Sequence, residues 1–331
     1  MIKKHVYILL FSLMLLIISA TLLSACVGKS ASPADELASI RYGGQLYPEE
    51  FLLKGGDFFS KYGLSVEHAL FSSGGDNNQA LISGAIDINI GSDSRSVALF
   101  DALDDDVLII ATSQSGDRYS TMVDPASEIT SWYDMVGQKT GIRLGTGAEL
   151  VLRSYFETTG DLRWEDFEWV DLRLEDMPDA LANGVIASFT AWEPTPAIAE
   201  ATTGAVIMMS YSDVSLSPVF IHTTTSFAED HKEELVAFLR AHLDKLAMIN
   251  DEVGKAARIA AKAADDEGLD ISARVFRSVF QRVDFSLDVN DEIIESLNKT
   301  AQYLLKIGEI EKIPKFRVDT SFLDEAKRLN Q

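Results

Sequence analysis

Two stretches of the chain decide the fold: QALISGAIDINI at residues 79–90 and DALANGVIASFT at residues 179–190. Each is typical of a helix end, a glycine that stops the helix and a buried strand, in the same order. A helix-and-strand unit that occurs twice predicts two lobes of similar plan.

The sequence around the first stretch alternates between strand-like and helical runs. Strands are predicted at 39–44, 64–71, 85–91 and 107–113, and helices at 50–61 (EFLLKGGDFFSK), 79–84 and 94–103. Asp76 or Asn77 is available to cap the helix at 79–84. Connections of two to six residues fit parallel strands joined by right-handed crossovers, so we expect an α/β fold.

A second set of elements surrounds the second stretch. Strands are predicted at 139–144, 167–173 and 185–190, with helices at 148–160 and 176–184. After further strands at 206–210 and 218–223 the chain turns mostly helical from Ala228 to its end. Apolar residues recur at helical spacing in HKEELVAFLRAHLDKLAMIN (231–250), and this helical region is expected to pack on the first lobe.

The amino-terminal segment has the form of a secretory signal. Lys3 and Lys4 precede an apolar run over 6–23, and Ser24, Ala25 and Cys26 follow it. Leu23 to Cys26 resembles the lipobox of bacterial lipoproteins, which implies cleavage after residue 25 and acylation of Cys26. An uncleaved membrane anchor and a chance cysteine are the alternatives. Residues 26–37 are small and polar and predict a lipidated flexible tether.

Composition bounds the function. The 331 residues include 51 acidic and 29 basic side chains, and loss of the signal changes the formal charge from −22 to −24. Such an acidic surface repels nucleic acid and anionic lipid headgroups. Cys26 is the sole cysteine, so the body has no disulfide, thiolate nucleophile or cysteine-ligated metal.

Enzymatic motifs are missing from the sequence. It contains neither G-x-S-x-G nor a phosphate-binding G-x-x-x-x-G-K. The five histidines lack metal-ligand spacing; His231 and His242 could share a helix face, but exposure beside Glu233 and Glu234 explains them. We therefore expect no catalytic residue, metal or cofactor, and no enzyme.

Four segments in order carry a family likeness: RYGGQLYPEEFLLKGGDFFSKYGLSVE (41–67), NNQALISGAIDINIGS (77–92), MVGQKTGIRLGTGAE (135–149) and DALANGVIASFTAWEP (179–194). Together they resemble nitrate/sulfonate/taurine-type solute-binding proteins of ABC importers and the related thiamine-pyrimidine-binding proteins. The resemblance implies a type II periplasmic binding protein-like fold, with two α/β lobes joined by two hinge crossovers and a helical carboxy-terminal region.

Applied to this chain, the resemblance divides it at stated positions. The signal peptide is 1–25 and the tether 26–37; lobe one comprises 38–114 and 214–331, and lobe two 115–213. The hinge strands are expected near 113–119 and 212–219. Ala187 stands where the family usually has aspartate, whereas Asp87 keeps that residue in the first lobe, and both positions are interpreted as structural.

Loops that lead from strands into helix starts are the predicted binding elements. Helix amino termini present free N–H groups and partial positive charge, which suit an oxyanion. Ordinary helix capping is the alternative for each loop. The candidates that contribute hydroxyls and glycine amides are Ser72, Ser73, Gly74, Ser92, Thr146 and Gly147.

Other candidates complete the predicted cleft. Gln45, Tyr47 and Trp192 are expected to form walls, with core packing as the alternative for Trp192. Asp93, Glu149 and Glu193 either contact ligand or stabilise helix starts. Should these carboxylates face the cleft, a zwitterion such as taurine would satisfy acids and helix ends together; a thiamine pyrimidine precursor is second, and nitrate fits least.

The predicted function is thus a solute-binding lipoprotein of an ABC importer that delivers a small sulfonate or zwitterion to its permease. The expected partners are the solute, the permease and ATPase subunits and the membrane through the lipid anchor, but no nucleic acid, and the chain is expected to be a monomer. It would be extracytoplasmic, lipid-anchored on the periplasmic side or cell surface. Alternatives are a non-transport sensing lipoprotein and a pyrimidine-synthesising enzyme of the same fold.

Overall fold

The structure is a computed structural model that describes residues 38–331. The predicted signal at 1–25, the lipidation at Cys26 and the tether at 26–37 lie outside the described residues. No helix within 38–331 is both long enough and apolar enough to cross a membrane.

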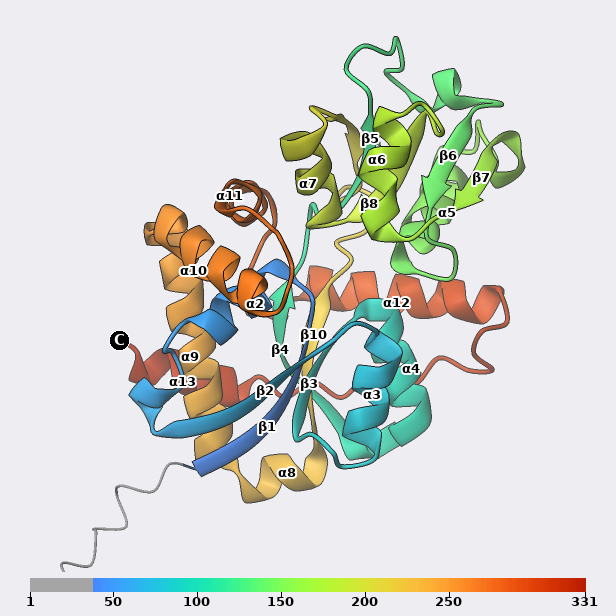
Figure 1. Cartoon of the computed structure of the whole chain (residues 1–331). Coiled ribbons are helices and arrows are strands. Elements are labelled where there is room, and N and C mark those ends of the chain that lie inside the picture. The colour runs from blue at the N-terminus through green and yellow to red at the C-terminus, as the bar shows by residue number, and fades with distance from the viewer. Residues whose placement is uncertain (1–37) are drawn as a thin grey trace, which may run out of the picture. The chain divides into compact units, whose positions relative to one another are not determined.

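The first sheet has five strands in the order β2-β1-β3-β10-β4 (Figure 1). Strands β1, β2 and β3 run parallel, and β10 is antiparallel to both of its neighbours. Their bounds are β1 Ala38–Gln45, β2 Leu64–Phe71, β3 Ile88–Ser92, β4 Val107–Gln114 and β10 Val219–Thr224.

The second sheet repeats this plan in the order β7-β6-β8-β5-β9. Strands β6, β7 and β8 are parallel, and β5, in the fourth place, is antiparallel to β8 and β9. The chain passes between the sheets at 115–118 and 211–218, and the strand after each passage, β5 or β10, takes the fourth place. The bounds are β5 Tyr119–Val123, β6 Lys139–Ile142, β7 Glu168–Asp171, β8 Ser188–Trp192 and β9 Val206–Ser210.

The repeated helix-glycine-strand unit that predicted this plan is present in both halves, down to the same hydrogen bond after each helix. Helix α3 (Gly74–Ile82) precedes β3 as α6 (Met177–Ala182) precedes β8. Gly84 and Gly184 follow these helices with φ of 71° and 66°, a left-handed conformation that glycine adopts without strain. The Gly84 N–H donates to the Leu81 carbonyl at 3.0 Å, and Gly184 repeats this with Leu181.

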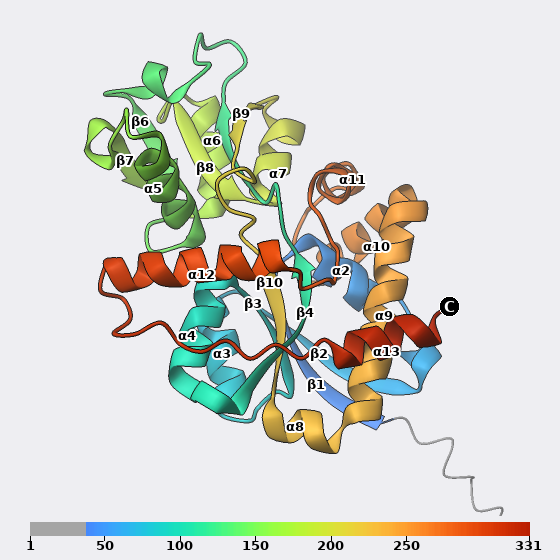
Figure 2. The same cartoon turned by 180° about the vertical axis from the view of Figure 1, so that it is seen from behind.

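Helices cover both faces of the first sheet (Figures 1 and 2). Strand β4 shows why: Leu108 and Ile110 join one apolar cluster, whereas Val107 and Ile109 join another on the opposite face. The helices on the first face are α2 (Pro48–Gly55), α9 (Lys232–Asp251) and α10 (Val253–Asp266); those on the second are α3, α4 (Asp93–Leu103) and α12 (Asp291–Lys306).

The remaining elements complete the two halves. Helix α13 (Ser321–Leu329) packs on α9, α8 (Thr225–Asp230) follows β10, and α11 (Ala273–Arg282) contacts both α10 and α7 (Thr195–Thr202). On the second sheet, α5 (Gly147–Thr159) belongs to one apolar cluster, and α6 and α7 to another. Short 3₁₀ turns lie at Ser60–Tyr62, Asp104–Asp106, Trp132–Met135, Trp164–Asp166 and Leu174–Asp176.

Three local predictions were wrong. The helix expected over 50–61 ends at Gly55, because Gly56 is extended with φ −98° and ψ 151°. Helix α3 begins earlier than expected and is capped by Ser73, not by Asp76 or Asn77. His242 is fully buried rather than exposed, because it faces Tyr42 and Phe238 across the core.

Candidate functional site

A pocket of about 640 Å³ lies where the parallel strands of both sheets end. Residues after the carboxyl ends of β1, β2 and β3 contribute one wall, and residues after β6, β7 and β8 contribute another. Strand ends that lead into helix starts are the usual ligand position in parallel α/β sheets. The pocket is therefore the candidate site.

Nine of the twelve predicted ligand-binding residues line this pocket. They come from five separate segments, and the fold brings them together. They are Gln45, Tyr47, Ser72, Ser73, Gly74, Ser92, Thr146, Gly147 and Trp192.

The three predicted acidic residues do not line the pocket. Asp93 is buried, accepts hydrogen bonds from the Ser94 N–H at 2.8 Å and the Thr300 hydroxyl at 2.6 Å, and has a pKa raised by burial. The other two are paired with arginines: Glu149 with Arg153 at 2.7 Å, and Glu193 with Arg282. The three carboxylates on which the expectation of a zwitterion depended are thus not part of the pocket lining.

The hydroxyl groups at the helix starts differ in whether they are free to bind a ligand. The Ser73 hydroxyl caps α3 by accepting from the Gly75 and Asp76 N–H groups at 3.2 and 3.4 Å. The Thr146 hydroxyl donates to the Arg143 carbonyl at 2.6 Å, so its proton is already used. The Ser72 hydroxyl has no hydrogen-bond partner within residues 38–331 and is exposed to the pocket.

Sequence reasoning missed three arginines that line the pocket. Arg95, Arg143 and Arg173 lie directly after β3, β6 and β7 or in the following first turn, and that position was the available signal. Arg143 lies 3.3 Å from Asp171, and Arg173 lies 2.9 Å from Asp176. Across the described range, Arg95 forms no ion pair, so its charge is left for the pocket.

Aromatic and aliphatic side chains form the rest of the lining. The Trp192 and Tyr119 rings meet edge to face, with centroids 6.2 Å apart. Glu175 is the one carboxylate that lines the pocket within the described residues. Basic side chains, helix starts and apolar walls together suit an anionic head group with an organic tail. The apolar part consists of Leu46, Tyr47, Phe51, Phe71, Tyr119, Leu174, Pro178, Trp192, Pro194, Ile198, Leu269 and Ile271.

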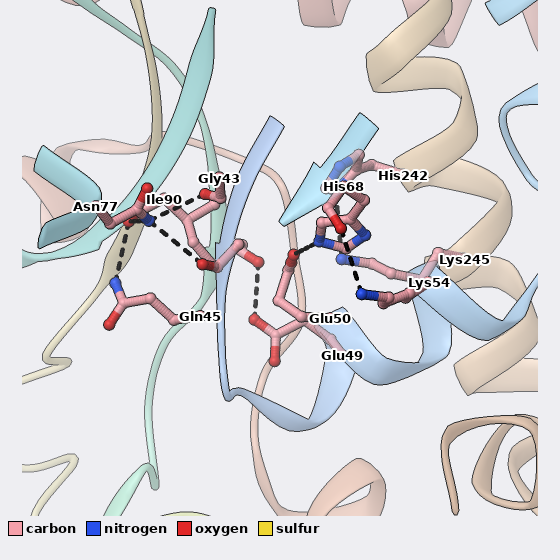
Figure 3. A network of polar contacts seen from close by, with 12 residues as sticks. Gly43, Gln45, Glu49, Glu50, Lys54, His68, Asn77, Ile90, His242 and Lys245 are labelled. Carbon is pink, nitrogen blue, oxygen red and sulfur yellow. Dashed lines mark hydrogen bonds and ion pairs between the residues drawn. The ribbon is translucent and has the colours of Figure 1, made fainter. Parts of the chain in front are cut away.

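A buried amide network fixes the strand ends below the pocket (Figure 3). The Asn77 side-chain amide donates to the Gly43 and Ile90 carbonyls at 3.0 and 2.9 Å, which joins α3 to β1 and β3. Gln45 donates to the same Ile90 carbonyl at 3.0 Å. These bonds hold Gln45, a pocket residue, in one orientation.

Beside this network, α2 begins with two buried glutamates (Figure 3). Glu50 lies 3.0 Å from the His68 ring, and Glu49 accepts from the Ser113 hydroxyl at 2.8 Å. Burial raises the pKa of Glu49 to about 7; the nearby Lys245 opposes this shift, and Glu50 adds to it. Tyr47, a pocket residue, is the N-cap position of α2, so these buried glutamates lie in the turn that directly follows the pocket wall.

Comparisons with known proteins agree with this architecture. A family model described as "NMT1/THI5 like" matches residues 52–250. The chain is 25% identical over 325 residues to the "Putative aliphatic sulfonates-binding protein" of Bacillus subtilis (strain 168), with 95% of this chain and 96% of the relative covered.

Solved structures share the fold. The periplasmic aliphatic sulphonate binding protein SsuA from Escherichia coli matches with a TM-score of 0.73 at 19% identity, over 86% of this chain and 90% of that chain. The alkanesulfonate-binding protein SsuA from Xanthomonas axonopodis pv. citri, bound to MOPS, matches with a TM-score of 0.66 at 16% identity, over 86% and 96%. The predicted two-lobed α/β fold and family are confirmed: the chain belongs to the NMT1/THI5-like family.

Proposed function

We propose that this chain is the extracytoplasmic solute-binding protein of an ABC importer, and that its ligand is a sulfonate with an apolar tail. The observation that carries the proposal is the composition of the pocket, in which Arg95, Arg143 and Arg173 accompany the starts of α3, α4 and α5. A sulfonate keeps its negative charge at any ordinary pH, so hydrogen-bond donors alone are enough to hold it.

The apolar walls support a ligand larger than taurine. The pocket volume of about 640 Å³ lies within the range typical of small-molecule sites, and its aromatic residues offer packing surface that taurine would leave unused. Asp93, Glu149 and Glu193 are bonded elsewhere, and Glu175, the one carboxylate in the described lining, lies 3.1 Å from Arg173, so an amine would have to compete with an arginine for it. Taurine is therefore expected to bind more weakly than an alkyl or aryl sulfonate.

The names of relatives support the proposal that the chain is a carrier and not an enzyme. The fold alone does not distinguish the two classes. The Bacillus subtilis relative is named as a binding protein. In contrast, the desulfurization enzyme DSZB has a similar fold, with a TM-score of 0.68 at 14% identity. Residues 38–331 contain no cysteine, so this pocket offers no thiol nucleophile.

The rest of the assembly belongs to the same proposal. Lobe one would comprise 38–114 with 214–331, and lobe two 115–213, so that a ligand that contacts both favours a closed form. Acylated Cys26 would hold the protein on the membrane, where it would pass its solute to the permease and ATPase subunits.

Calorimetry on the ligand-free protein tests the proposed ligand class. The panel consists of methanesulfonate, taurine, 1-octanesulfonate, naphthalenesulfonate, nitrate and a hydroxymethylpyrimidine. Octane- or naphthalenesulfonate should bind with a dissociation constant of about 1 μM or below, equivalent to about −8 kcal/mol, and taurine more weakly. Binding of the pyrimidine or nitrate but of no sulfonate would transfer the assignment to those ligands.

A second measurement separates carrier from enzyme. After incubation with the tightest ligand, the protein is denatured and the released compound is identified by mass spectrometry. A carrier returns the sulfonate unchanged, whereas release of sulfite or of a modified ligand at more than one equivalent per protein would show turnover.

A further inference from the structure

Arg118, in the passage from β4 to β5, is a buried cation without a counter-ion. It is only 2% exposed, and within residues 38–331 its side chain forms no ion pair. One guanidinium nitrogen donates to the Ser217 carbonyl. A guanidinium has five N–H donors and stays protonated in proteins, so Arg118 holds a buried positive charge with no carboxylate paired directly to it.

Two other cationic side chains in the interior, Arg282 and Lys245, avoid an unpaired buried charge in ways that are not open to Arg118. Arg282 is paired with Glu193 and Glu200. Burial lowers the pKa of Lys245, and an ammonium is able to lose its proton when it is buried. Arg118 has neither a paired carboxylate nor a neutral form.

The nearest carboxylates are already engaged. Asp93 and Glu49 act on Arg118 only at longer range. Asp93 accepts from the Ser94 N–H and the Thr300 hydroxyl, and Glu49 accepts from the Ser113 hydroxyl at 2.8 Å. The positive charge of Arg118 therefore points to an anion from outside the chain.

Two pocket residues flank the guanidinium. Its central carbon lies 5.3 Å from the ring centroid of Tyr47 and 5.4 Å from that of Tyr119. Both tyrosines line the pocket, and each hydroxyl lies close enough to the guanidinium for Arg118 to be its side-chain hydrogen-bond partner. The two rings thus separate a fixed charge from the space where a ligand would sit.

We infer that Arg118 is the positioning residue that gives this pocket its preference for anions, through its field and through the hydroxyls of Tyr47 and Tyr119. The inference rests on the proposed function for the ligand class. A guanidinium behind two tyrosines orients their hydroxyls to donate toward a negative head group. In a water-poor site such a charge is worth more than the exposed charges of Arg143 and Arg173, which nearby carboxylates and solvent screen.

Backbone contacts hold this charge in place before any ligand arrives. The Arg118 carbonyl accepts from the Glu193 N–H at 2.9 Å, and its side chain reaches Ser217 on the returning passage. The guanidinium is thus attached to both passages between the sheets, so little reorganisation is needed on binding.

Paired ligands that differ only in charge test the inference. The ligands are 1-octanesulfonate and methyl octyl sulfone, which share a tail and sulfonyl oxygens. Arg118→Met should weaken octanesulfonate binding by about 10- to 100-fold and change sulfone binding by less than about 3-fold, since a charge-assisted hydrogen bond is lost only with the anion. Arg118→Lys should restore part of the preference. Arg277→Met, on the exposed surface of α11, is the matched control.

Each outcome of this experiment decides something. Equal losses for both ligands would assign Arg118 a merely structural role and overturn the inference. If Arg118→Met does not fold, the Tyr47→Phe and Tyr119→Phe variants replace it, and an unchanged sulfonate-to-sulfone ratio in both would overturn it equally.

A failure of the proposed function can be distinguished from a failure of the inference about Arg118. If the wild-type protein binds no sulfonate, then sulfate, nitrate and carboxylates are measured by thermal shift on the wild type and on Arg118→Met. Stabilisation by one of these anions that Arg118→Met removes would keep the role of Arg118 and reject the sulfonate. No stabilisation by any anion would reject both.

Discussion

Of the two glycines that line the pocket, Gly147 leaves less space for a side chain than Gly74. A β-carbon at this position would lie 2.1 Å from the Tyr119 hydroxyl oxygen. Gly147→Ala should therefore push Tyr119 out of the pocket wall, weaken sulfonate binding and lower the free energy of unfolding by about 1–3 kcal/mol through overpacking. Calorimetry and urea denaturation measure the two effects.

Gly75→Ala is the control, because it also adds one methyl group to a helix start. There the nearest atom to a β-carbon is the Ser73 hydroxyl oxygen at 3.4 Å, an ordinary contact. If both variants bind and unfold alike, the close approach of Tyr119 to Gly147 does not shape the site.

Glu49 makes the stability of the protein depend on pH. Its pKa rises to about 7 in the folded state because it is buried, with the Glu50 carboxylate adding and the Lys245 ammonium opposing. A raised carboxyl pKa gives stability that is complete below the ordinary value near 4.5 and is lost as pH rises through about 7.

Glu49→Gln mimics the protonated acid and should remove this pH dependence of the unfolding free energy. From pH 4.5 to 8 the wild-type protein should lose about 2–3 kcal/mol of unfolding free energy relative to Glu49→Gln, measured by urea denaturation at several pH values. Exposed Glu67→Gln on β2 should show no such trend. A constant difference between wild type and Glu49→Gln across that range would mean that Glu49 is not protonated in the folded protein.

A site residue could be predicted from the sequence when its position at the end of a strand is enough to bring it to the pocket. Ser72 directly follows β2, Ser92 ends β3 and Gly147 begins the helix after β6, so the parallel sheets bring them to the pocket. Asp93 and Glu193 could not be placed this way, because their partners come from elsewhere: Thr300 lies 207 residues from Asp93, and Arg282 lies 89 residues from Glu193. Only tertiary packing brings such groups together.

At the scale of elements, Arg282 joins α11 to the α7 region through two ion pairs, of which the one with Glu193 is buried. Arg282 at the end of α11 contacts Glu193 before α7 and Glu200 within it. The Glu193 side chain is only 1% exposed, so Arg282→Met would leave it buried without a counter-ion. This change should cost about 3–5 kcal/mol of unfolding free energy.

Urea denaturation measures that loss. Arg277→Met, an exposed arginine on the same helix, should stay within about 0.5 kcal/mol of the wild type. Adding Glu193→Gln to Arg282→Met should recover part of the loss, because the buried charge is then gone. A loss below 1 kcal/mol for Arg282→Met would show that Glu193 finds water or protonation instead.

Elements were easiest to predict where local pattern and burial agree. Strand β2 has the predicted bounds of 64–71, and the units α3–β3 and α6–β8 repeat as expected. The helix over 50–61 was overextended because its apolar residues continue through Phe58 and Phe59, although the backbone turns at Gly56. There the apolar side chains pack from a loop, which periodicity does not distinguish from a helix.

For the whole molecule, a negative net charge would repel an anionic ligand, but the pocket itself is basic. The formal charge is −22, yet the pocket is lined by three arginines and one glutamate among the described residues. Capture then depends on short-range contacts rather than on long-range attraction. Binding is accordingly expected to be less sensitive to salt than that of a protein with a broad basic surface.

The closing motion is the prediction that involves the whole described chain. Within 38–331 only the passages at 115–118 and 211–218 connect the two sheets, and Arg118 ties these passages together through Ser217. The exposed pair of Lys306 and Glu157, 2.7 Å apart, joins α12 to α5 but is too solvated to hold the halves on its own. Arg282 also joins the halves through Glu193 and Glu200, and Glu193 lies beside the first passage because its N–H donates to the Arg118 carbonyl at 2.9 Å. A ligand that contacts both walls should therefore shift the population toward a closed form.

Small-angle scattering of the protein with and without 1-octanesulfonate measures this shift as a smaller radius of gyration. Hydrogen exchange should slow at Gly74 and Gly147, whose N–H groups start α3 and α5 in the pocket wall, and stay unchanged in α13 on the far side of α9. Methyl octyl sulfone, which lacks the charge, is the matched ligand control and should produce little of either change. Tight sulfonate binding with an unchanged radius would mean that the site is already formed in the free protein, and that hinge bending has no part in capture.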